Sequence, residues 1–79
     1  MTKNLKNISL KLFREYLEWK GLKKIRSTGG HEIWAGKQLN RPVVLQSHID
    51  PIPEFIIRNA LRTLGVTRED FIKFLEGEK

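Results

Sequence analysis

Two consecutive glycines followed by a histidine, Gly29-Gly30-His31, form the position in this sequence best suited to chemistry. Glycines at a turn carry no side-chain bulk, so an RNA backbone can approach the histidine closely. A histidine, whose ordinary pKa is about 6.5, can take a proton from a ribose 2′-hydroxyl near neutral pH. The alternative is a surface histidine at a turn with no catalytic role. The cations expected to hold the phosphate are Lys23, Lys24, Arg26 and Lys37.

A second histidine, His48, lies in the segment 46–51 and is followed two residues later by Asp50. A carboxylate at that spacing can hold an imidazole, which would let His48 act as an acid partner. The alternative is a structural histidine that orders the loop leading into the next helix.

Two arginines four residues apart, Arg58 and Arg62, lie near Phe55 in a segment with a helical pattern. An aromatic ring between arginines suits a contact with a protein partner. Exposed cations at this spacing are also typical of a solvated helix face, so both interpretations stay open.

The positive charge is concentrated in the first half of the chain, which has 79 residues and a net charge of +6. Residues 1–41 carry ten basic and three acidic residues, whereas residues 42–79 carry five and six. A cationic field of this kind attracts a polyanion and releases its counterions, so nucleic acid is one expected partner. Solubility alone is the alternative explanation.

Composition excludes several classes of protein. The chain has no cysteine, which excludes disulfides, Cys-ligated zinc and a thiol nucleophile. No HExxH or EF-hand spacing is present, so no metal site is expected. No run of about 18 or more apolar residues occurs, and residues 1–13 lack a secretory apolar stretch. The expected location is therefore the cytoplasm, with no membrane contact.

The hydrophobic pattern predicts one domain over residues 1–79, with three strands between helices. Tyr16, Trp19 and Trp34 are expected in the core, with base stacking as the alternative for the tryptophans. Thr67 and Asp70 have the spacing of a capping box at the start of the last helix. The predicted elements are a helix over 9–20, strands over 22–28, 31–35 and 41–46, and helices over 53–64 and 67–75.

Three consecutive strands joined by short turns predict an antiparallel meander, one face of which must be covered by helices. This is an α+β fold of order α-β-β-β-α-α, the layout of double-stranded-RNA-binding domains with an extra C-terminal helix. Strand alternation leaves the direction of His31 open. It points to the uncovered face if Trp34 is the core anchor, and to the rim of the helix side if Ile33 is.

The ordered set of motifs resembles the HicA family of small bacterial toxins, which are RNA-cleaving partners of HicB antitoxins. The likeness covers about residues 9–75 and is carried by Gly29-Gly30-His31, Ser47-His48 and Leu64-Gly65. It implies that His31 is the catalytic histidine of the family's Gly-Ser-His motif, and that His48 matches a histidine common after the third strand. Gly30 stands where serine is usual. Either Thr28 or Ser27 replaces the missing hydroxyl, or activity is reduced.

The leading hypothesis is a toxin endoribonuclease that cleaves mRNA with His31 as acid or base, without metal or small-molecule cofactor. Thr28 and His48 are candidate supporting residues. An acidic, HicB-like antitoxin is expected to cover the turn before His31. The alternatives are a non-catalytic RNA-binding module and an inactive relative kept for protein contact. The expected RNA-contact residues are Lys23, Lys24, Arg26, Gly29, Gly30 and Lys37, and those for a protein partner are Phe55, Arg58 and Arg62.

Overall fold

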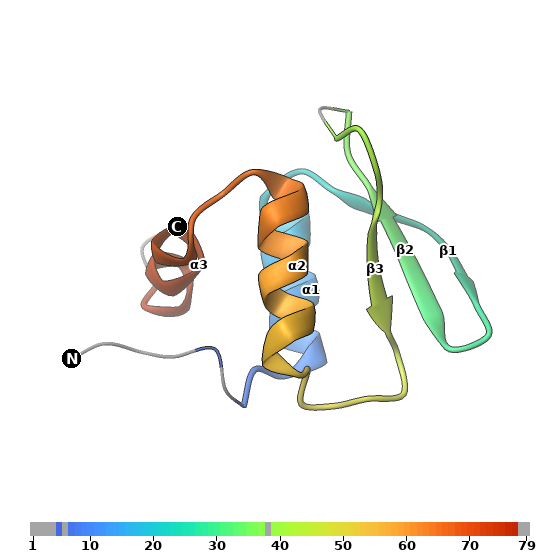
Figure 1. Ribbon diagram of the computed structural model, residues 1–79, viewed down its shortest axis with the longest axis horizontal. Helices are drawn as coiled ribbons and strands as arrows, with labels where there is room; N and C mark the ends of the chain where they lie inside the picture. Colours follow the sequence, from blue (N-terminus) through green and yellow to red (C-terminus); the bar gives the residue numbers. More distant parts are fainter. Residues whose placement is uncertain (1–4, 6, 38, 78–79) are drawn as a thin grey trace.

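The chain folds into three layers: a sheet, a pair of helices against it, and one further helix behind that pair (Figure 1). The computed structural model describes residues 5, 7–37 and 39–77; the other residues of the predicted domain 1–79 lie outside this description. The predicted α+β fold and its α-β-β-β-α-α order are confirmed. The elements are α1 (Leu10–Trp19), β1 (Lys23–Thr28), β2 (His31–Ala35), β3 (Val43–Gln46), α2 (Glu54–Leu64) and α3 (Arg68–Leu75).

Helix α1 begins and ends where the sequence predicts. The Ser9 hydroxyl accepts a hydrogen bond from the Leu12 amide at 3.0 Å, which satisfies one of the free amides of the first turn. After the last turn, Gly21 adopts a positive φ of 90° and the Leu22 amide donates back to the Leu17 carbonyl. The buried face of the helix consists of Leu10, Phe13, Tyr16 and Leu17.

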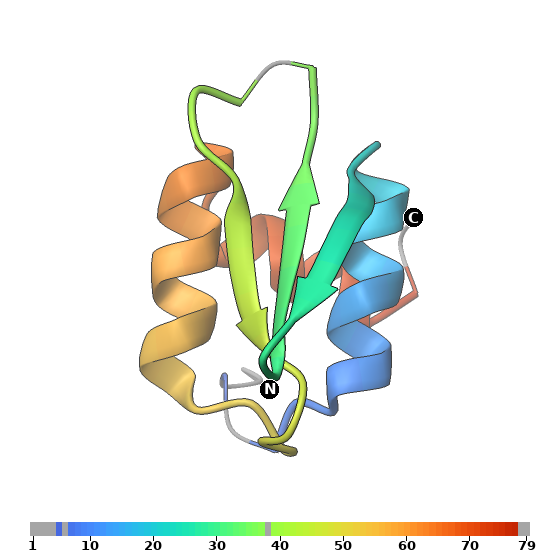
Figure 2. The same cartoon turned by 90° about the vertical axis from the view of Figure 1, so that its right-hand side faces the viewer.

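The three strands form one antiparallel sheet in the order β1-β2-β3, with one face packed on the helices and one face open (Figure 2). Gly29 and Gly30 both have positive φ, as a two-residue hairpin turn requires. Trp34 is only 3% exposed and Glu32 2%, so these two side chains of β2 face the helices. Alternation then places His31 and Ile33 on the open face. The question that the sequence left open is thus settled in favour of the uncovered face.

Helix α3 packs behind α1 through aromatic contacts. The rings of Phe71 and Phe74 meet the Tyr16 ring edge-on, at centroid distances of 4.7 and 5.1 Å. The Thr67 hydroxyl caps α3, as predicted, by accepting from the Asp70 amide. In a full capping box the Asp70 carboxylate would bond back to the Thr67 amide. Here it accepts a hydrogen bond from the Tyr16 hydroxyl at 2.7 Å, which links α3 to α1.

One core prediction is wrong: Trp19 is 42% exposed. It occupies the last position of α1, where its ring lies at the edge of the aromatic cluster, 5.4 Å from Phe74 between centroids. Tyr16 and Trp34, in contrast, are buried as predicted. The apolar arc of a helix identifies its inner face but does not show how far along the helix the covering layer extends.

Candidate functional site on the open face of the sheet

His31 is the first residue of β2 and lies exposed on the open face of the sheet. Its direct partners in the two neighbouring strands are Thr28 and Gln46. Directly paired residues of an antiparallel sheet have their side chains on the same face, so these two flank the imidazole. Ser27 pairs with Glu32 and therefore faces the helix side. Thr28, not Ser27, is the hydroxyl on the same face as His31.

His48 comes to the same end of the sheet as His31 although 17 positions separate them in the sequence. The Ser47 amide donates to the Gly30 carbonyl at 2.7 Å, which ties the end of β3 to the turn before β2. The His48 ring then lies against Gly30: a Cβ atom at position 30 would be 2.9 Å from His48 Nδ1. A contact that short is not tolerated unless the ring moves. Glycine at position 30 therefore leaves the space that the His48 imidazole occupies.

The backbone at Gly30 also favours glycine, because its φ is +82°. A serine at this position would be strained in this conformation as well as pressed against His48. Gly29 also has a positive φ, of +56°, but a Cβ there would meet open space. The two glycines of the turn thus differ, because a neighbouring side chain excludes a Cβ only at Gly30.

Asp50, which the sequence offered as an orienting partner for His48, has a different role. Its Oδ1 accepts a hydrogen bond from the Leu10 amide at 3.0 Å and so caps the first turn of α1. Within the described part of the chain, no hydrogen bond joins His48 to Asp50. The carboxylate ties the loop after β3 to α1.

The predicted RNA-contact cations are spread along the sheet and do not surround His31. Arg26 pairs with Ile33 and so lies on the open face, one cross-strand pair beyond His31 on that side. Lys23 is on the same face at the far end of β2, and Lys37 follows that end in the loop between β2 and β3. Lys24 pairs with Trp34 and points to the helix side. Residues two apart in a strand normally share a face, but a bulge at residue 25 places Lys24 and Arg26 on opposite faces.

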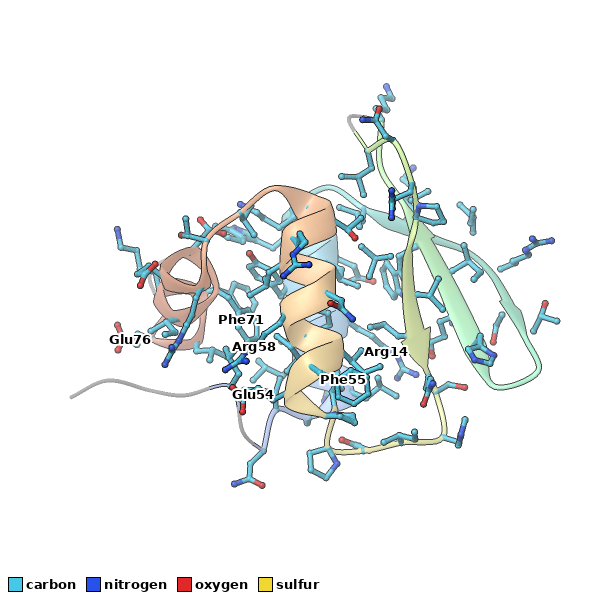
Figure 3. The ribbon with its side chains drawn as sticks, viewed as in Figure 1. Arg14, Glu54, Phe55, Arg58, Phe71 and Glu76 are labelled. Atoms are coloured by element: carbon cyan, nitrogen blue, oxygen red, sulfur yellow. The ribbon has the colours of Figure 1, made fainter. Side chains whose placement is uncertain are left out.

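Behind the site, an ion pair between a buried carboxylate and a partly exposed guanidinium joins β2 to α1. The Glu32 carboxylate is bound by the guanidinium of Arg14 and accepts a hydrogen bond from the Trp34 indole at 3.1 Å. Figure 3 shows Arg14 between the helical layer and the sheet. The hydrogen bonds from Arg14 hold the pKa of Glu32 below its ordinary value, and the Trp34 bond acts in the same direction. This pair, which sequence reasoning missed, anchors the strand that begins with His31.

The candidate protein-contact residues on α2 form a separate surface. Phe55 is 63% exposed, and Arg58 and Arg62 are also exposed. Arg58 donates to Glu54 at 2.6 Å, an ion pair between neighbouring turns of the helix. Figure 3 shows Glu54, Phe55 and Arg58 on the first turns of α2, in the helical layer and away from the open sheet face. A partner bound there would not by itself cover His31.

Across the described residues, no group of three or more histidine or acidic side chains is placed to hold a metal ion. No helix in that same part of the chain has the length and apolar content needed to span a bilayer. Comparisons of the chain with protein-family models, with curated proteins and with solved structures give no match.

Proposed function

We propose that this protein is an endoribonuclease of the toxin type, related to the HicA family, which cleaves mRNA laid across the open face of the sheet. The observation that carries the proposal is that His31 begins β2 on that face while the His48 ring lies against Gly30, the residue that precedes His31. Two imidazoles beside a glycine turn offer one group to act as a base and one to act as an acid. The motif order quoted from the sequence supports the same conclusion.

In the proposed reaction, one histidine removes the proton from a ribose 2′-hydroxyl, and O2′ attacks the adjacent phosphorus. The bond between phosphorus and O5′ then breaks, and the leaving O5′ takes a proton from the second histidine. The products are a 2′,3′-cyclic phosphate and a free 5′-hydroxyl. The nucleophile belongs to the substrate, so this route requires no metal-activated water. His31 and His48 share the two proton transfers, and Thr28 offers a hydroxyl beside His31.

Binding would rest on the charge of the chain and on the cations of β1. Arg26 and Lys23 lie on the open face with His31, so a phosphate backbone that runs along β1 meets both. Gly29 leaves room for the backbone to approach the turn, since a Cβ there would meet open space, whereas the His48 ring occupies the space beside Gly30. An acidic, HicB-like antitoxin that covers this turn in the cytoplasm is the partner that such an activity calls for.

Comparison of the unmodified protein with His31→Ala and His48→Ala tests the proposal, with growth and RNA integrity scored on induction in bacteria. Both histidines are exposed, so neither change should unfold the protein. We expect His31→Ala to abolish growth arrest and RNA cleavage, and His48→Ala to reduce cleavage at least about tenfold, since positioned acid–base catalysis contributes about 10²–10⁴-fold. Equal behaviour of the unmodified protein and His31→Ala would remove His31 from the mechanism.

A non-catalytic RNA-binding module of the double-stranded-RNA-binding type is the second candidate. It is favoured by Gly30, which lacks the hydroxyl of the family motif, and by exposed apolar and cationic side chains on the sheet face, such as Val44 and Arg26. Gly30 is equally compatible with the third possibility, an inactive relative kept for protein contact. Unchanged RNA binding in His31→Ala, with no cleavage by either protein, would favour the module. Absence of RNA binding altogether would favour the relative kept for protein contact.

A further inference from the structure

An apolar groove of about 840 Å³ opens at the end of the molecule opposite the glycine turn. The end of α1, the start of β1, the end of α2 and the loop between β2 and β3 all lie at this end of the molecule (Figures 1 and 2). His31 and Ala35 mark the two ends of β2, so the part of the groove lined by Ala35 lies about 13 Å from the histidine. Its apolar lining includes Trp19, Leu22, Ile25, Leu39, Leu64 and Val66.

Two of the lining side chains are far more exposed than large apolar residues usually are. Ile25 is 60% exposed and Trp19 is 42% exposed. Ile25 is the extra residue of the β1 bulge, which turns it out of the regular pairing with β2. An exposed isoleucine and an exposed indole lining the same hollow are typical of an interaction site, and tryptophan is among the residues that contribute most to binding energy.

The charge at this groove is of one sign. Lys20, Lys23 and Lys37 line it, and no carboxylate does among the residues described there. The Lys20 ammonium lies 5.2 Å from the centre of the Trp19 ring and forms an ion pair with Asp70 at 2.9 Å. Lys23 and Lys37 have no ion-pair partner within the described chain. Two unpaired cations beside an apolar floor fit an acidic segment that also carries an apolar side chain.

We propose that this groove binds an acidic segment of a protein partner, which inserts one large apolar side chain between Trp19 and Ile25. Carboxylates on either side of that anchor would meet Lys23 and Lys37. Protein fits this groove better than RNA, because its walls are mostly aliphatic and offer a single ring on which a base could stack. A partner seated here reaches the histidines only if it also runs along the open face. The proposal concerns binding alone and does not depend on RNA cleavage.

The test is an NMR titration of the ¹⁵N-labelled protein with a nine-residue peptide that carries a central Phe flanked by four acidic residues on each side. The protein has two tryptophans, so its spectrum has two indole signals. The Trp19 signal should move on addition of the peptide, while that of the buried Trp34 stays in place as an internal reference. The same peptide with Ser in place of Phe should bind at least about tenfold more weakly, because it lacks the anchor.

Ile25→Ser and Val44→Ser form a matched pair of variants, because both remove an exposed aliphatic side chain from the sheet but only Ile25 lines the groove. Ile25→Ser should lower the affinity for the Phe peptide about tenfold, and Val44→Ser should lower it by less than about twofold. Charge reversal at Lys23 and Lys37 together should also weaken it. Equal binding of the Phe and Ser peptides, or a Trp19 signal that does not move, would overturn the proposal. If a single-stranded RNA oligomer moves the Trp19 signal and binds with higher affinity than the peptide, the groove is an RNA site instead.

Discussion

Arg14 and Glu32 allow the strength of the contact behind the site to be tested, because one cation holds a buried carboxylate in its charged form. Arg14→Met removes the guanidinium, and Glu32 keeps only the bond from the Trp34 indole. Removal of one partner of a buried ion pair costs about 3–5 kcal/mol. The Arg14 side chain is 36% exposed, so water replaces part of the lost interaction and we expect a loss of about 2–3 kcal/mol at pH 7. That loss should lower Tm by roughly 10–20 °C.

The cost of Arg14→Met should depend on pH in a definite direction. In the unmodified protein Arg14 lowers the pKa of Glu32 below its ordinary value of 4.5, so the stabilisation is present above that pH and is lost as the pH falls through the folded pKa. In the variant, only the Trp34 hydrogen bond and the charge of Lys24 still oppose the effect of burial, which raises the Glu32 pKa. The variant is then most stable below the unfolded pKa and loses stability as the pH rises through the folded one. The difference between the two proteins should therefore shrink as the pH falls.

Urea denaturation at pH 7 and at about pH 4.5, on both proteins, measures this difference. The double variant Arg14→Met with Glu32→Gln is the control, because a neutral amide leaves no buried charge to titrate. Its free energy of unfolding, relative to Glu32→Gln alone, should change little between the two pH values. A cost of Arg14→Met below about 0.5 kcal/mol at pH 7, the range of an exposed pair, would refute the reasoning. So would a cost that is the same at both pH values.

Three further predictions concern the turn, the sheet face and α3. Gly30→Ser should destabilise the protein by about 1–2 kcal/mol and lower RNA cleavage, because a side chain at position 30 meets the His48 ring. Gly29→Ser is the control and should spare cleavage, because a Cβ there meets open space. A gain in cleavage by Gly30→Ser would contradict the packing of His48 against position 30. Arg26→Glu should weaken RNA binding about tenfold and reduce its salt slope by about one, measured by fluorescence anisotropy, and an unchanged slope would place the RNA elsewhere. Tyr16→Phe should lower the free energy of unfolding by about 1 kcal/mol at pH 7, measured by urea denaturation. The loss should be smaller at low pH, because the Tyr16 hydroxyl lowers the pKa of Asp70. A loss that grows at low pH would disprove that coupling.

Local signals in the sequence predicted the elements well, because the residues that start and stop them act over a few positions. Ser9 caps α1, Gly21 ends it, and the glycine pair turns β1 into β2. The direction of His31 could also be narrowed to two choices, which the burial of Trp34 decided. Such features follow from backbone geometry and strand alternation alone.

Features that depend on distant contacts could not be predicted in the same way. Glu32 is polar and would ordinarily be placed outside, but alternation with Trp34 puts it inside, where a residue of α1 neutralises it. Lys24 and Arg26 are two apart and lie on opposite faces, because the bulge between them breaks the alternation that a sequence pattern assumes. The approach of His48 to the turn requires the register of two strand pairs, which no short motif encodes.

The chemical nature of the RNA ends tests the proposed mechanism most directly. RNA is incubated with the purified protein in the presence of a chelator, and the ends of the fragments are identified by mass spectrometry, with His31→Ala as the matched control. Attack by the ribose 2′-hydroxyl predicts fragments that end in a 2′,3′-cyclic phosphate and begin with a 5′-hydroxyl, and no such fragments from His31→Ala. Fragments that begin with a 5′-phosphate, or cleavage that strictly requires magnesium, would contradict it.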